Sequence, residues 1–467
     1  MGWTNAIGKK ITVFILVLFI VLYMVFPGKI YSIDWIAAAI MISILTIAGI
    51  RMLSNSRGDV KERSFIYKLF WSALIIRIVA MFVLLLISYK TWSMFFVVGA
   101  RDEMVYYRIA SEAVDIWKDQ SISNAYLHIY DSYKNDISNT GFSTFLMLPI
   151  LLFGQSPVVI KIFLCFVGSI VVIRGYKLAR LLIEEPAARL AGILLALYPI
   201  SWFYSAIILK ESIMVLLMIE ALILLVKTQK SFKLHYLLIT LLFIILLFFF
   251  RPAISILLLM VSGFSFFMQY RKRPLILNLL LASIIIFTYV YFLKSTGRFD
   301  EYYDQYTNIE EFTQERLSYM ERINPFVTLI GSPVFAVLSY ISPFPSVVLV
   351  PNAGGLPHSE YYYHIAGNIY WIVLAFFSFY GLYYSIRFKK QEMAVLMAFV
   401  VGYQFILLKA MMFTSVRFSY PVKPFLLILA AYGIFKMKNK KWYPVYLAAM
   451  VVMIIGWNYV RLKGRGA

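Results

Sequence analysis

Long apolar runs recur along the whole chain and are separated by short polar stretches, most of them basic. A helix that crosses a membrane needs about 20 predominantly apolar residues, and somewhat fewer where flanking side chains reach the interface. The pattern predicts about thirteen such helices, near 11–26, 32–50, 69–88, 158–174, 190–208, 212–226, 234–250, 253–268, 275–293, 365–386, 392–408, 421–435 and 443–460. The expected fold class is all-α, a polytopic transmembrane helix bundle that forms a single integral membrane domain over residues 1–467.

Two further apolar segments are not expected to cross. The run 142–153 is short for a span and Pro149 interrupts it, so we expect it to lie along or dip into the outer leaflet. Three prolines break the region 326–350, which we interpret as a re-entrant segment or a short hairpin.

Composition supports a membrane protein, and charge predicts its orientation. Hydrophobic residues make up 62% of the chain, mean hydropathy is +0.80 and the formal net charge is +21. The basic residues fall in short clusters between the runs, as the positive-inside rule requires, so nucleic acid is not needed to explain the charge. The clusters predicted to be cytoplasmic are 51–68, 174–189, 227–233, 271–273, 387–390 and 436–441. The first run is interpreted as a retained helix rather than a signal peptide because no small-residue cleavage site follows it.

This orientation places two large regions on the extracytoplasmic side of the membrane. They are 89–157, with juxtamembrane helices, and 294–364, which contains the re-entrant or hairpin segment; together they hold most of the 23 acidic residues. Solvation of long loops explains most of that acidity, but Asp102 and Glu103 stand directly at a helix end, at the start of a predicted amphipathic helix over 102–117. A carboxylate at this boundary could accept a proton from an acceptor hydroxyl. The alternative is an ordinary polar helix cap.

Other charged residues fall on the same predicted side. Lys210 and Glu211 lie in the short turn before 212–226, and Arg251 lies in a tight turn where Pro252 starts the next helix. Arg417 lies beside Tyr420 in a segment that follows an outer helix end. An arginine fork suits phosphate oxygens and a lysine supplies a point charge, although both side chains also serve as anchors for lipid headgroups.

Two charges are predicted to lie deep in the membrane, and one histidine cluster resembles a metal site only weakly. Arg77 and Glu220 are costly there unless they face the bundle interior. His358, Glu360 and His364 could be drawn as metal ligands, but their spacing is not specific. The sequence has no phosphate-cradling Walker loop, dinucleotide fingerprint or Cys-x-x-Cys element, so a nucleotide-driven pump or a redox carrier has no support.

Taken in order, these segments resemble a family of membrane enzymes. ARDEMVYYRIA, beginning at residue 100, is followed by the proline-containing GFSTFLMLPILLFG, by the acidic position at Lys210–Glu211 and by SVRFSYPVKPFLLILAAYG. The series, over about 69–230 and 417–433, is similar to the GT-C superfamily of polytopic glycosyltransferases, in particular the bacterial relatives of protein O-mannosyltransferases and of the lipid A aminoarabinose transferase. The chain departs from the family at Phe418, where a tyrosine is usual, and at Glu211, where aspartate is commoner.

The resemblance implies a reaction and a set of site residues. A sugar would pass, with inversion, from a polyprenyl-phosphate donor to a glycan or lipid acceptor on the outer side of a bacterial plasma membrane, for building cell-envelope polysaccharide. The implied catalytic residues are Asp102, Glu103 and Glu211. The implied substrate-binding residues are Tyr106, Tyr107, Lys210, Arg251, Arg417 and Tyr420. No cofactor is assigned, and a divalent metal ion stays open because the family's His-rich acceptor motif is absent.

Two other functions remain open from the sequence. A polymerase or ligase that moves a lipid-linked oligosaccharide also carries outer arginines, but it depends less on an acidic pair after an early helix. A transporter or flippase would show ionisable residues near helix midpoints and symmetry between its halves, whereas the charge here is concentrated in asymmetric outer regions.

The orientation can be tested by cysteine labelling. Ser121 is predicted to lie outside and Ser56 to lie in the cytoplasm, so a membrane-impermeant thiol reagent should label Ser121→Cys in intact cells and Ser56→Cys only after permeabilisation. The native Cys165 falls within an apolar run and serves as the unlabelled background. The reverse labelling pattern would overturn the predicted orientation.

Overall fold

The computed structural model describes residues 60–92, 95–97, 101–134, 136–231, 233–269, 337–345, 360–388, 391–409 and 415–463. Within these residues the secondary structure consists of fifteen labelled α-helices, two short 3-10 helices and a helical stretch at 337–341. The predicted all-α class is therefore confirmed.

Several helices are long and apolar enough to cross a membrane. The five candidate spans among the described residues are Val60–Lys90, Pro157–Leu182, His364–Arg387, Val416–Lys436 and Trp442–Tyr459. They belong to α3 (Val60–Trp92), α7 (Pro157–Leu182), α16 (Glu360–Arg387), α18 to α19 (Val416–Ser419 and Lys423–Lys436) and α20 (Trp442–Lys463). These helices indicate a multi-pass membrane protein.

The predicted apolar runs that can be compared with the structure coincide with helical segments. The runs 11–26, 32–50 and 275–293 lie outside the described residues, as do the acidic stretch 294–325 and most of 326–350. The remaining helices that match predicted runs are α8 (Glu185–Leu197), α9 (Pro199–Ala206), α10 (Glu211–Lys230), α11 (Leu234–Phe248), α12 (Pro252–Gln269) and α17 (Ala394–Lys409). The predicted tight turn at Arg251 is present, because α11 ends at Phe248 and α12 begins at Pro252.

The predicted span 190–208 is a broken helix rather than a continuous one. Helix α8 ends before Tyr198, Pro199 occupies the first turn of α9, and the two axes differ by 52°. Proline is tolerated at the start of a helix but disrupts its interior, which explains why the helix breaks at this residue.

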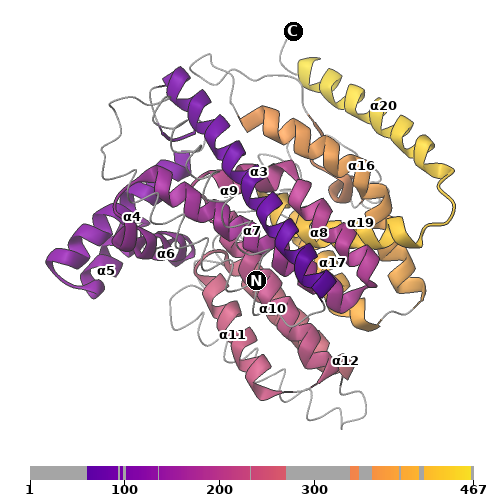
Figure 1. The fold of residues 1–467 in the computed structure, drawn as a ribbon, viewed down its shortest axis with the longest axis horizontal. Coiled ribbons are helices and arrows are strands. Elements are labelled where there is room, and N and C mark those ends of the chain that lie inside the picture. The colour runs from indigo at the N-terminus through magenta and orange to yellow at the C-terminus, as the bar shows by residue number, and fades with distance from the viewer. Residues whose placement is uncertain are drawn as a thin grey trace, which may run out of the picture.

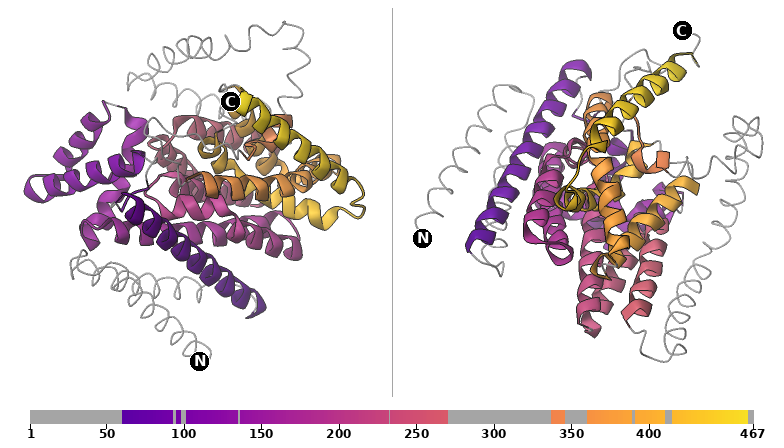
Figure 2. Two further views of the ribbon diagram at one scale, coloured as in Figure 1. Left: turned by 90° about the horizontal axis from the view of Figure 1, so that it is seen from above. Right: turned by 90° about the vertical axis from the view of Figure 1, so that its right-hand side faces the viewer.

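Helix α7 lies at the centre of the bundle and packs against α3, α8 and α10 (Figure 1). Helices α11 and α12 pack beside α10, and α19 packs between α8 and α16. Helix α20 lies at one edge and is held on α16 by the hydroxyls of Tyr443 and Tyr446, which donate to the carbonyl oxygens of Val373 and Ile372 at 3.0 and 2.8 Å. The left view of Figure 2 shows α20 at the rim.

The first of the two regions predicted to lie outside contains three helices that extend to one side of the bundle (Figures 1 and 2). They are α4 (Arg101–Asp119), α5 (Ile122–Ser132) and α6 (Ile137–Phe153). Helix α4 confirms the amphipathic helix expected over 102–117, whereas α5 and the first turn of α6 were not predicted. Local capping explains both, because Ser121 accepts from the Asn124 N–H at 3.1 Å and Asp136 accepts from the Ser138 N–H at 2.9 Å.

The two deep charges have polar partners inside the bundle. The Arg77 guanidinium is fully buried and donates to Ser201 Oγ at 2.7 Å, to Ser205 Oγ at 3.3 Å and to the Ala73 carbonyl at 3.1 Å. Glu220 forms an ion pair with Arg174 on α7. Both observations satisfy the requirement that a charge in the membrane interior faces the protein.

Helices α16 and α19 approach most closely at two glycines. A Cβ atom at Gly381 would overlap the carbonyl oxygen of Leu429, and one at Gly433 would overlap the carbonyl oxygen of Phe377. Small residues of this kind allow the backbones of membrane helices to come into contact.

Gly433→Ala should therefore destabilise the protein, because the new methyl group meets backbone atoms that cannot rotate away. We expect a loss of about 1–3 kcal/mol, as for overpacked cores, visible as a lower melting temperature in detergent. The matched control is Gly456→Ala in α20, where an added Cβ meets nothing within 4 Å. Equal melting temperatures for the two variants would contradict the close approach of α16 and α19.

Candidate active site

Three segments far apart in the sequence meet at one end of the bundle. Asp102 lies in the first turn of α4, Glu211 is the first residue of α10, and Arg417 lies in α18. A carboxylate in the first turn of a helix is stabilised by the helix dipole and by unpaired backbone N–H groups. The helix starts therefore favour the two acidic positions.

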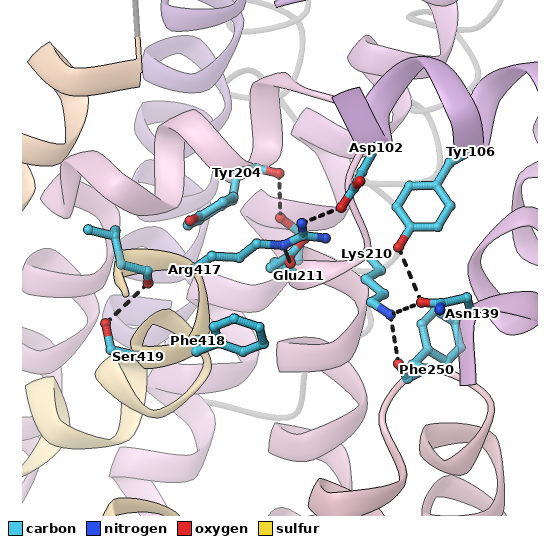
Figure 3. A network of polar contacts seen from close by, with 12 residues as sticks. Asp102, Tyr106, Asn139, Tyr204, Lys210, Glu211, Phe250, Arg417, Phe418 and Ser419 are labelled. Atoms are coloured by element: carbon cyan, nitrogen blue, oxygen red, sulfur yellow. Dashed lines mark hydrogen bonds and ion pairs between the residues drawn. The ribbon is translucent and has the colours of Figure 1, made fainter. Parts of the chain in front are cut away.

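Arg417 joins the two carboxylates. Its Nε atom donates to Glu211 Oε1 at 2.6 Å, and its Nη1 atom donates to Asp102 Oδ2 (Figure 3). The side chain of Asp102 is 49% exposed and that of Arg417 is 29% exposed, whereas Glu211 is fully buried. Asp102 is thus the carboxylate of the two that an external molecule can reach.

The second oxygen of Glu211 has no hydrogen-bond partner although it is buried. Buried carboxylate oxygens are usually satisfied, so an unpaired one marks a position where a ligand hydroxyl or a water molecule is expected. Two buried aromatic rings lie next to this network: the centroid of the Tyr420 ring is 4.7 Å from that of the Tyr204 ring.

Lys210 supplies a second cation beside this network. Its ammonium donates to Asn139 Oδ1 at 2.7 Å and to the Phe250 carbonyl at 2.9 Å, and it lies 6.0 Å from the centroid of the Tyr106 ring (Figure 3). Burial lowers the pKa of Lys210 from 10.5 to about 8, and repulsion from Arg251 acts in the same direction. Lys210 therefore stays mostly protonated at neutral pH and loses its charge above about pH 8.

Arg251 lies on the same side as Arg417. The Arg251 guanidinium is 4.7 Å from the centroid of the Phe418 ring, and Phe418 directly follows Arg417 in the chain. Phe418 stands where the resembled family usually has tyrosine, and here it offers a ring face to the arginine. Two arginines from α18 and the α11–α12 turn thus approach one region.

The structure brings most of the predicted residues together and leaves two apart. Asp102, Glu211, Arg417 and Lys210 form the network, while Tyr106, Arg251 and Tyr420 border it. The Tyr107 ring instead packs against Phe96, 5.5 Å between centroids.

Glu103 does not contact Arg417. It points into the protein, is fully buried and forms an ion pair with Lys161 of α7 at 2.7 Å. Sequence reasoning missed Asn139 and Lys161 as members of this region. A lysine at the start of an apolar run was the available signal for Lys161, since such a charge needs a partner.

No group of three or more His, Cys, Asp or Glu side chains among the described residues is arranged to hold a metal ion. His358 and the side chain of Glu360, two of the three members of the histidine cluster, lie outside the described part of the chain. The His364 ring contacts the rings of Phe203 and Tyr204 at 5.4 and 6.4 Å between centroids.

Comparison with solved structures gives only distant likenesses of fold. Neither a family model nor a curated protein matches the sequence. The fold is similar to the oligosaccharyltransferase AglB of the archaeon Archaeoglobus fulgidus, solved with an inhibitory peptide and a dolichol-phosphate, with a TM-score of 0.48 and 14% sequence identity. The similarity covers 86% of this chain and 55% of that protein, and it assigns no function to this chain.

The low pKa of Lys210 predicts how stability depends on pH. Between about pH 8 and 10.5 the unfolded chain holds the Lys210 proton and the folded chain does not, so the free energy of unfolding should rise with pH in this window. Lys210→Met removes this contribution. The wild-type melting temperature should therefore increase relative to that of Lys210→Met between pH 7.5 and 9.5, and parallel curves would contradict the buried, charge-repelled environment.

Proposed function

We propose that the protein is a membrane glycosyltransferase that moves a sugar from a polyprenyl-phosphate donor to a hydroxyl of a glycan or lipid acceptor on the extracytoplasmic side. The observation that supports this most directly is the Arg417 fork held between Asp102 and Glu211. It combines a group that suits phosphate with an exposed carboxylate that suits a hydroxyl.

The reaction exchanges one bond at the anomeric carbon of the sugar. The acceptor oxygen attacks this carbon, its proton passes to Asp102, and the bond from the anomeric carbon to the phosphate oxygen breaks. The electron pair of that bond stays on the departing polyprenyl phosphate. Because attack and departure occur on opposite faces of the sugar, the configuration is inverted.

Arg417 connects the two halves of this reaction. In the free protein its fork is used by the carboxylates, and a donor phosphate competes with them for the same N–H groups. A phosphate that draws the guanidinium away leaves Asp102 Oδ2 open to accept the hydroxyl proton. The base thus becomes available when the donor is bound.

The neighbouring groups suit a leaving phosphate. Lys210 and Arg251 add positive charge beside Arg417, which stabilises charge that develops on the phosphate. Glu211 and the rings of Tyr106 and Tyr420 are buried, so they support the site from within rather than contact the sugar. The basic clusters at the other helix ends support an extracytoplasmic site.

Asp102→Asn tests the proposed base. The amide keeps the size and much of the hydrogen bonding but cannot take a proton, so turnover should fall by about 10²–10⁴-fold with little loss of donor binding. Glu211→Gln should cost less, because buried Glu211 positions Arg417 rather than meets the acceptor. The measurement is sugar transfer by purified protein in nanodiscs, with a panel of polyprenyl-phosphate monosaccharides and envelope glycans from a deletion strain as acceptors.

The matched control is Asp115→Asn, which removes an exposed carboxylate further along α4 and should retain wild-type turnover. Monodispersity of each variant is checked alongside. Full activity in Asp102→Asn would refute its role as base. A deletion strain that lacks a long polymer rather than a single sugar would instead favour a polymerase or ligase.

A further inference from the structure

Glu103 makes a set of contacts that the proposed reaction does not use. Its Oε2 atom accepts from the Val97 N–H at 2.8 Å, and its Oε1 atom accepts from the Ile208 N–H at 3.0 Å. The Lys161 ammonium lies 2.7 Å from Oε1, and the two side chains are 0% and 1% exposed. Each Glu103 oxygen is therefore hydrogen-bonded and neither is exposed to substrate.

The partners of Glu103 come from the segments that carry the site. Val97 precedes α4, on which Asp102 lies, and Ile208 stands three residues before Glu211 at the start of α10. Lys161 belongs to the central helix α7 and also donates to the Phe95 carbonyl at 2.8 Å. The Glu103 carboxylate thus links the segment before α4 and the segment before α10 to the central helix α7.

This arrangement is specific to Glu103 among the carboxylates of α4. Glu112 and Asp115 lie on the exposed side of the helix and form ion pairs with surface residues at 3.2–3.9 Å, and Asp115 also accepts an exposed hydrogen bond from Gln155 Nε2 at 2.8 Å. Surface pairs contribute little to stability or geometry, whereas removal of one member of a buried pair leaves an uncompensated charge. The neighbouring residues Asp102 and Glu103 therefore have different environments and different uses.

We propose that Glu103 is a positioning residue that fixes the places of Asp102 and Glu211 on either side of Arg417. The kinetic effects expected of this role rest on the proposed glycosyl transfer. The structural effects do not depend on that reaction. Without Glu103, the start of α4 and the start of α10 lose their common fastening, and the Arg417 fork no longer meets two fixed carboxylates.

The kinetic test uses Glu103→Gln, which keeps the side-chain volume but removes the charge that pairs with Lys161. Misplacement of a reacting group by about 1 Å can cost about 10²-fold, so we expect kcat to fall by roughly that factor with a smaller change in donor KM. The decrease of the rate at low pH (the acid limb of the pH–rate profile) should remain, because it reports protonation of the base and Asp102 is still present. In the double variant Glu103→Gln/Lys161→Met part of the rate should return, since no buried charge is left unpaired.

A structural test does not depend on the reaction. Spin labels at Arg108→Cys on α4 and Ser231→Cys after α10 report the separation of the two helices, and the native Cys165 is buried. Glu103→Gln should broaden the distance distribution, and Asp115→Asn should leave it unchanged. If Glu103→Gln fails to fold, the double variant is measured in its place, and it should still be broader than wild type because the amide cannot satisfy every partner.

The outcomes separate the positioning role from the proposed function. Loss of the acid limb in Glu103→Gln without recovery in the double variant would make Glu103 the base and overturn the positioning role. Wild-type kcat in Glu103→Gln, or an unchanged distance distribution in the variant that folds, would overturn it as well. If the wild type transfers no sugar from any donor tested but Glu103→Gln still broadens the distribution, glycosyl transfer fails and the positioning role stands.

Discussion

The ion pairs of Arg417 with Asp102 and Glu211 are the interaction on which the proposed site depends. They join the starts of α4 and α10 to the short helix α18, although these segments are hundreds of residues apart in the chain. An arginine fork holds two carboxylates in a fixed relative geometry because its N–H groups point in set directions within one plane, whereas the donors of an ammonium group rotate. The site is therefore defined by one planar group rather than by a continuous motif.

The cost of burying charge explains why such a network lies at a helix end and why other charges in the bundle are arranged differently. Arg77 is held by two serine hydroxyls and a carbonyl, and Lys423 by the Ser342 carbonyl at 2.8 Å and the Trp371 ring at 4.0 Å. In both cases dipoles and a ring replace a carboxylate partner. Arg417, by contrast, is 29% exposed to solvent and has carboxylate partners, which in the proposed reaction a donor phosphate displaces.

The sequence predicts the helices well and the connections between them poorly. A run of about 20 apolar residues has few alternatives to a helix in a membrane, so the described helices match the predicted runs. The break at Pro199 follows from a single residue, but helix α5 depends on the cap at Ser121, which looked like part of a loop. Candidate residues such as Asp102 and Arg417 can be selected by type and position. Their pairing cannot, because it requires contacts across the whole chain.

The three carboxylates show how environment separates residues of equal chemistry. Asp102 and Glu103 are adjacent, yet successive positions on a helix point about 100° apart, so one faces the outer surface and the other the interior. Glu103 is satisfied by two backbone N–H groups and a lysine, and Glu211 is buried with one oxygen unpaired. Only a carboxylate with an exposed oxygen can exchange a proton with an acceptor that arrives from outside. The acidic pair at the start of α4 therefore contains one exposed carboxylate, which suits the proposed base, and one buried carboxylate, which suits the proposed positioning role.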